Sequence, residues 1–172
     1  MPEANQIGSF EQTVLPHLDA AYNLARWLTR NDHDAEDVVQ EAYLRAFEFF
    51  AGFYGTDGRG WLLTIVRNTC YTWLRRNRSG ELLTQFDEEI HREEIASPNP
   101  EELFLENADR QHLQDALEEL PAEFREALVL REIEGLSYKE IADVSGIPLG
   151  TVMSRLARAR DRLKDALARR IK

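Results

Sequence analysis

The sequence predicts an all-α protein made of two small helical domains joined by a flexible linker. Apolar residues recur every three or four positions over most of the chain, as one buried helix face requires, and no segment alternates as a strand would. Residues 79–102 differ, because they combine an acidic run with the segment Ser97-Pro98-Asn99-Pro100. This composition is typical of a linker. We therefore expect domains at 1–79 and 106–172 and an acidic linker at 80–105.

Three helices are predicted in the first half. The first covers about residues 8–30. The second begins near Asp34, where Asp32 or Asp34 is positioned to cap it, and it carries apolar residues at helical spacing. Glycines between residues 52 and 60 then interrupt the chain, and a third helix follows over 59–78.

The second half predicts a helix-turn-helix motif. Two apolar stripes come first, one ended by Pro121 and one running from Phe124 to near Gly135. The segment Ser137-Tyr138-Lys139-Glu140 then reads as a capping box that starts a short helix, which Ser145-Gly146 ends. A new helix over 149–167 follows a tight turn, and this arrangement is typical of DNA-binding proteins.

Composition indicates a globular protein. Of its 172 residues, 43% are hydrophobic and 30% are charged, and no apolar run approaches the length of a membrane-spanning helix. The N-terminus lacks the pattern of a secretory signal, and one cysteine, Cys70, excludes an internal disulfide. We expect a cytoplasmic protein without membrane insertion.

The net charge of −10 argues against a nucleic-acid partner until it is divided along the chain. Residues 51–79 carry one acid and five bases, a net charge of +4, and residues 149–172 carry two acids and eight bases, a net charge of +6. The rest of the chain is acidic. Two compact basic segments predict two separate contacts with a polyanion, although basic helix ends that complement the helix dipole would look similar.

The second basic segment has the pattern of a recognition helix. Val152, Leu156 and Leu163 form one apolar stripe, and bases flank it on both sides, with Arg160 and Lys164 on one of them. Cations that neutralise phosphates beside smaller side chains that reach base edges suit a helix in the major groove. A solvated basic face on a bundle helix is the alternative. The residues predicted to contact DNA are Thr151, Ser154, Arg155, Arg158 and Arg162.

The first basic segment places polar and aromatic residues opposite an apolar face. This pattern is weaker, because an amphipathic surface helix would share it, but cations beside rings and amides suit single-stranded DNA. Trp61 and Trp73 are expected in the core, and a loop with Phe53 precedes the helix. The residues predicted to contact DNA here are Tyr54, Arg67, Asn68, Tyr71 and Arg75.

Neither catalytic nor metal-binding motifs are evident. The sequence has no glycine-rich phosphate loop, no H-E-x-x-H and no paired cysteines or histidines at metal-ligand spacing. We expect neither an enzyme nor a cofactor or metal site.

Four blocks resemble bacterial sigma factors of the sigma-70 family, in that family's order. Residues 34–47 resemble region 2.2, residues 60–69 resemble regions 2.3 and 2.4, and residues 120–142 and 150–160 resemble region 4. The short chain, without regions 1.1 or 3, is similar to the extracytoplasmic-function (ECF, group IV) class. The resemblance implies a subunit that binds core RNA polymerase and directs it to promoters.

The resemblance also implies roles for named residues. Asp37, Gln40 and Glu41 fall at the family's D-x-x-Q-E positions, which dock on the polymerase β′ coiled coil, and region 4 is expected at the β flap. The helix over 59–78 with its preceding loop would open the −10 element, and the helix over 149–167 would read the −35 element. An anti-sigma factor is expected to control the protein.

One residue departs from the family's pattern, and one alternative function stays open. Met153 stands where many relatives have a basic residue. The alternative function is a two-domain helix-turn-helix regulator that acts without being a polymerase subunit, and this alternative would not need the arginine and aromatic residues of the third helix.

Overall fold

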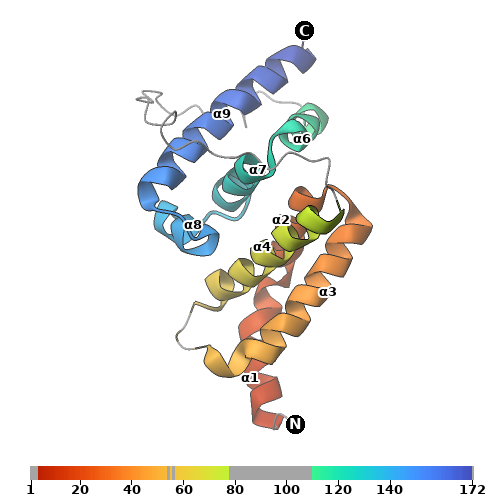
Figure 1. Cartoon of the computed structure of the whole chain (residues 1–172), viewed down its shortest axis with the longest axis vertical. Helices are drawn as coiled ribbons and strands as arrows, with labels where there is room; N and C mark the ends of the chain where they lie inside the picture. Colours follow the sequence, from red (N-terminus) through yellow and green to blue (C-terminus); the bar gives the residue numbers. More distant parts are fainter. Residues whose placement is uncertain (1–3, 54, 56, 78–109, 172) are drawn as a thin grey trace. The chain divides into compact units, whose positions relative to one another are not determined.

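The computed structural model describes residues 4–53, 55, 57–77 and 110–171 (Figure 1). Over these ranges the chain is helical nearly throughout and contains no strand, which confirms the all-α prediction. The chain divides into two compact units. The linker predicted at 80–105 lies outside the described residues. No helix in the described ranges combines the length and the apolar character needed to cross a membrane.

The first unit is a bundle in which α2, α3 and α4 pack against one another (Figure 1). Its apolar side chains, among them Leu24, Leu28 and Leu62, are fully buried between these helices. The elements in chain order are α1 (Ala4–Val14), η1 (Leu15–His17), α2 (Leu18–Thr29), α3 (Asp32–Phe49), η2 (Phe50–Gly52) and α4 (Gly58–Asn77).

Two predicted features of the first unit were wrong. The single helix expected over 8–30 is interrupted by the 3₁₀ turn η1, because Pro16 has no N–H to donate to the preceding turn. The cap of α3 is Asn31, whose Oδ1 accepts a hydrogen bond from the Asp34 N–H at 3.0 Å. Asp32 instead forms an ion pair with Arg26, with Nε and Oδ1 2.6 Å apart.

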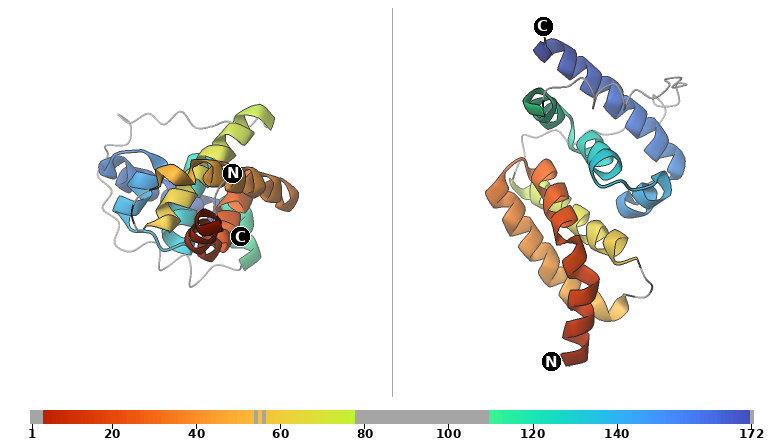
Figure 2. Two further views of the ribbon diagram at one scale, coloured as in Figure 1. Left: turned by 90° about the horizontal axis from the view of Figure 1, so that it is seen from below. Right: turned by 180° about the vertical axis from the view of Figure 1, so that it is seen from behind.

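In the second unit, α9 packs along α6 and α7 (Figure 2). The predicted apolar stripe of α9, which includes Val152, Leu156 and Leu163, is buried there, as expected from its spacing. The elements from Arg110 onward are α6 (Arg110–Glu119), α7 (Ala122–Leu128), the π-helix η4 (Val129–Ile133), α8 (Tyr138–Ser145) and α9 (Leu149–Ile171).

The joint between α6 and α7 is held by a buried arginine. Arg125 is 0% exposed, and its Nη1 donates to the carbonyl oxygen of Leu120 at 2.5 Å and to that of Glu118 at 3.4 Å. These carbonyls lie at the end of α6, where a helix leaves its last acceptors without partners. The guanidinium therefore satisfies them and fixes the angle at which α7 departs.

Candidate functional site

The helix-turn-helix is present with the predicted cap. The Ser137 N–H donates to Glu140 Oε1 at 2.8 Å, and the Glu140 N–H donates to Ser137 Oγ at 3.1 Å, so both halves of the capping box are formed. The helix α8 that follows ends at Ser145, and the next residue, Gly146, has a φ of +69°, a conformation that glycine adopts without strain. Pro148 then accepts hydrogen bonds from the first turn of α9. This geometry sets α9 as the second helix of the motif.

The structure separates the residues predicted to read DNA on α9. Arg162 is exposed, and Ser154 and Arg158 are half-buried at the surface. Thr151 and Arg155 are only 8% and 7% exposed, so these two side chains are mostly buried. Fewer of the predicted DNA-contact residues on α9 are therefore accessible at the surface than the sequence indicated.

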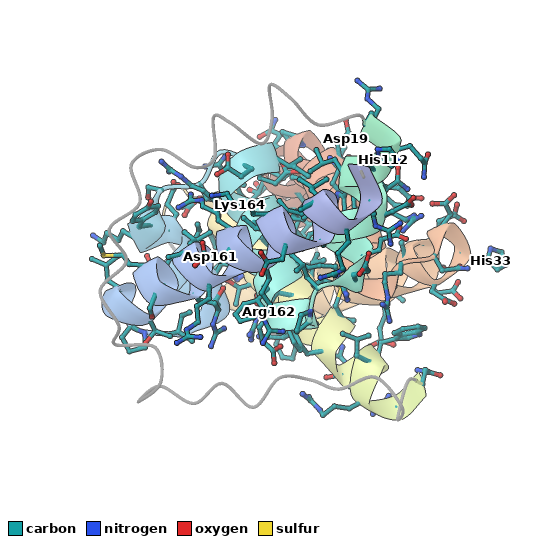
Figure 3. All side chains as sticks on the ribbon, turned by 90° about the horizontal axis from the view of Figure 1, so that it is seen from above. Asp19, His33, His112, Asp161, Arg162 and Lys164 are labelled. Carbon is teal, nitrogen blue, oxygen red and sulfur yellow. The ribbon has the colours of Figure 1, made fainter. Side chains whose placement is uncertain are left out.

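The prediction that bases flank both sides of the α9 stripe was wrong for Arg160. Its Nη2 lies 3.2 Å from Glu132 Oε1, and its side chain is only 10% exposed, so it is held within the unit. Lys164 and Arg162 are exposed and leave α9 on opposite sides, with Asp161 between them (Figure 3). The cation of Arg162 also lies 5.2 Å from the ring centre of Phe124.

On α4, the predicted polar face is formed in part. Asn68 and Arg75 are exposed, and Arg67 is half-buried and donates to Asn68 Oδ1 at 3.3 Å. Tyr71 was placed on this face wrongly, because it is only 7% exposed. Helices α1, α2 and α3 all contact α4, so a wide arc of it is covered. The guanidinium of Arg67 lies over the covered Tyr71 ring, 4.4 Å from its centre.

Aromatic side chains cluster where the chain enters α4. Trp61, expected in the core, is half-buried, and its ring centre lies 4.9 Å from that of Phe53 and 6.0 Å from that of Phe50. Trp73 is likewise half-buried. The predicted contact residue Tyr54 lies outside the described residues. The cluster presents partly exposed rings beside the polar face of α4.

The start of α4 is fixed by two close contacts. Asp57 Oδ1 accepts a hydrogen bond from the Gly60 N–H at 2.9 Å and so caps the helix. Gly58 packs against α1, and a Cβ atom added there would lie 2.8 Å from the backbone oxygen of Thr13. The N-terminal helix therefore rests directly on the first turn of α4.

The helix α3 presents an acidic and amide face. Asp37, Gln40 and Glu41 are all at the surface, whereas Val38 and Ala42 are buried beneath them and Val39 is half-buried. The sequence reasoning missed Leu44, which is 61% exposed. Its position seven residues after Asp37 is the signal that places it on the same face. A surface of this kind suits a partner with basic and apolar groups.

Among the described residues, no three histidine, cysteine, aspartate or glutamate side chains are grouped closely enough to hold a metal ion.

Two family models match this chain. Residues 13–80 match Sigma-70 region 2, and residues 110–163 match Sigma-70, region 4. The first match contains the polar face of α4 and the acidic face of α3, and the second contains the helix-turn-helix.

Curated relatives extend over most of the chain. It is 40% identical to the ECF RNA polymerase sigma factor SigE of Mycolicibacterium smegmatis, over 94% of this chain and 62% of that protein. It is 39% identical to the ECF RNA polymerase sigma-E factor of Escherichia coli K12, over 74% of this chain and 71% of that protein. The chain thus spans less than two thirds of the length of the first relative.

Two solved structures share the fold. The sigma factor RpoE of Bartonella quintana, solved in complex with the anti-sigma factor NepR, matches with a TM-score of 0.70 and 33% identity, over 93% of this chain and 97% of that one. CnrH, solved in complex with the cytosolic domain of CnrY, matches with a TM-score of 0.64 and 27% identity, over 92% and 87% of the two chains.

Proposed function

This chain belongs to the ECF sigma factors of the sigma-70 family, and we propose that it binds core RNA polymerase and directs transcription initiation at a specific set of promoters. The observation that carries the proposal is the presence in one chain of a capped helix-turn-helix and a separate helix bundle with a polar, aromatic-flanked face. We further assign it to group IV. It acts as a polymerase subunit in the cytoplasm and not as an enzyme.

The α3 face is proposed as the docking surface for the polymerase β′ coiled coil. Asp37 and Glu41 supply negative charge, Gln40 supplies an amide, and the exposed Leu44 supplies apolar area at the same surface. Complementary charge guides association, and a central apolar side chain contributes contact energy once water is excluded. The second unit is proposed to contact the β flap.

The two DNA-reading surfaces divide the promoter between them. Helix α9 takes the −35 element through Ser154, Arg158 and Arg162, which remain at the surface. Helix α4 takes the −10 element through Arg67, Asn68 and Arg75 together with the neighbouring aromatic rings. Opening the duplex needs no nucleotide hydrolysis, because stacking and polar contacts to the extruded bases offset the few kcal/mol that unstacking costs.

The charge distribution indicates that DNA binding depends on polymerase. The whole chain carries a net charge of −10, so its basic surfaces stand in an acidic background. We expect the free protein to have little affinity for duplex DNA at physiological salt, and to gain it when polymerase positions both surfaces. An anti-sigma protein is proposed as its regulator, because the similar sigma factor RpoE was solved with one.

Reconstitution tests this function directly. The protein is mixed with core RNA polymerase and a promoter library, and transcripts are mapped. We expect a stable holoenzyme and new, specific start sites. Asp37→Lys should reduce holoenzyme formation, whereas Glu11→Lys on α1, an equal charge change at another exposed position, should not. Absence of both holoenzyme and transcripts would refute the proposal. Site-specific DNA binding without polymerase would instead support the two-domain regulator.

A further inference from the structure

Two apolar side chains stand at the surface of the DNA-reading end of α9. Leu149 is 49% exposed and Met153 is 52% exposed, one helical turn apart on the first two turns of the helix. Most other apolar residues of α9 are buried in the unit, so packing does not account for this pair. The N-terminal turns of the second helix are the part of a helix-turn-helix that contacts base edges.

One cation on the side of α9 that carries this pair is turned away from the solvent. Arg160 lies two turns after Met153 on the same side, and its guanidinium is directed into the unit by the ion pair with Glu132. Arg160 is therefore not offered to phosphate, and Lys164, an exposed cation on this side, lies three turns beyond Met153, so the first two turns of this side carry no cation. Uncharged methyl and thioether groups remain there to face the DNA.

Two other residues on the outward face of α9, Asp161 and Ser154, affect which groups of the DNA can approach it. Asp161, exposed three helical turns after Leu149, places a carboxylate that repels phosphates (Figure 3). The Ser154 hydroxyl points its proton at the carbonyl oxygens of Gly150 and Thr151, 3.2 and 3.3 Å away, which leaves its oxygen as an acceptor. The uncharged groups that can face base edges thus lie at the start of α9, at Leu149, Met153 and Ser154.

We propose that Leu149 and Met153 form an apolar reader of thymine C5-methyl groups in the upstream promoter element. The C5-methyl is the only apolar group that the major-groove edge of a standard base pair presents. This inference rests on the proposed function and adds to it a chemical specificity at that site. It predicts a thymine in the upstream element whose methyl group, and not its O4 acceptor, is recognised.

Deoxyuridine isolates that methyl group, because it differs from thymidine only by lacking it. The holoenzyme is titrated with promoter duplexes found by reconstitution, in which each upstream thymine is replaced singly by deoxyuridine. We expect at least one position at which the replacement weakens binding by about three- to fivefold, the value of one buried methyl group. Met153→Gln should bind the two duplexes equally, whereas Met153→Leu should retain part of the difference.

The controls separate this inference from the proposed function. Leu15→Gln removes a leucine that is 50% exposed in the other unit, and it should leave the discrimination unchanged. Wild-type protein that binds every deoxyuridine duplex as tightly as the parent would overturn the inference, as would undiminished discrimination in Met153→Gln together with Leu149→Gln. Both results leave promoter-specific transcription in place. Failure to form any holoenzyme refutes the proposed function itself.

Discussion

Arg160 and Glu132 form an ion pair that joins α9 to the π-helix η4, with Nη2 and Oε1 3.2 Å apart and side chains only 10% and 21% exposed. The two residues are 28 positions apart, so the pair is a tertiary contact. Its carboxylate comes from a helix that is locally widened, since the Glu134 N–H donates to the Val129 carbonyl at 3.0 Å. The widened turn and the ion pair together fix one side of α9.

Glu132→Ala should destabilise the protein, because it leaves the mostly enclosed guanidinium of Arg160 without this carboxylate. We expect a loss of about 1–3 kcal/mol in the free energy of unfolding, measured by urea denaturation. Glu48→Ala, at an exposed position on α3, should cost less than about 0.5 kcal/mol. Adding Arg160→Met to Glu132→Ala should recover most of the loss. If the double variant is no more stable than the single one, the ion pair is not the cause.

Ser137→Ala removes one half of the capping box at the start of α8. The Glu140 N–H then has no side-chain acceptor, and we expect a loss of about 1 kcal/mol in the free energy of unfolding. Ser137→Thr keeps the hydroxyl and should restore most of the stability. Thermal unfolding followed by circular dichroism measures all three proteins. Equal melting temperatures for Ser137→Ala and wild type would show that the cap contributes nothing.

Glu119 forms ion pairs that join α6 to the last turns of α9, and their contribution to stability depends on pH. The hydrogen bond from Arg170 lowers the pKa of the Glu119 carboxyl below its ordinary value of 4.5, and Arg169 adds to the effect. Since the folded-state pKa lies below the unfolded one, this stabilisation is fully present above about pH 4.5 and is lost as pH falls through the lower, folded-state pKa.

The difference in unfolding free energy between wild type and Glu119→Gln measures this contribution. We expect the difference to be constant from pH 7 down to about pH 5 and to shrink below the ordinary pKa of 4.5. Glu11→Gln on α1 controls for the general effect of removing a carboxylate. A difference that grows on acidification would mean that folding raises the pKa of Glu119 and would contradict the role of Arg170.

Arg158→Ala and Asn68→Ala should separate the two proposed DNA surfaces. The first variant loses a cation at the duplex-reading helix, so its holoenzyme should bind duplex DNA of the −35 element about tenfold more weakly. The second variant loses an amide on the α4 face, so it should bind that duplex normally and open the promoter more slowly. Permanganate reactivity of unpaired thymines follows the opening. Equal effects of both variants on duplex affinity would contradict the division.

The features predicted best from the sequence are those that depend on residues close together in the chain. The capping box at Ser137 and the apolar stripe of α9 both depend on spacing within one helix, and both are present. The burial of Tyr71 was missed because helical spacing gives a residue's angle and not the width of the arc that other helices cover. Arg160 was misplaced because its partner Glu132 comes from a distant turn. The docking and DNA-contact roles stay predictions.

Three glycines before and within the first turn of α4 are alike as letters but differ in mutational tolerance. Gly52 has open space around it, so a side chain is expected to be accepted there. Gly55 has a φ of +115°, which strains any L-residue. At Gly58 an added Cβ would lie 2.7 Å from the Thr13 methyl, so even alanine must push α1 away from α4. In a saturation library selected for folded protein, we therefore expect many residue types at position 52, few at position 55 and almost only glycine at position 58.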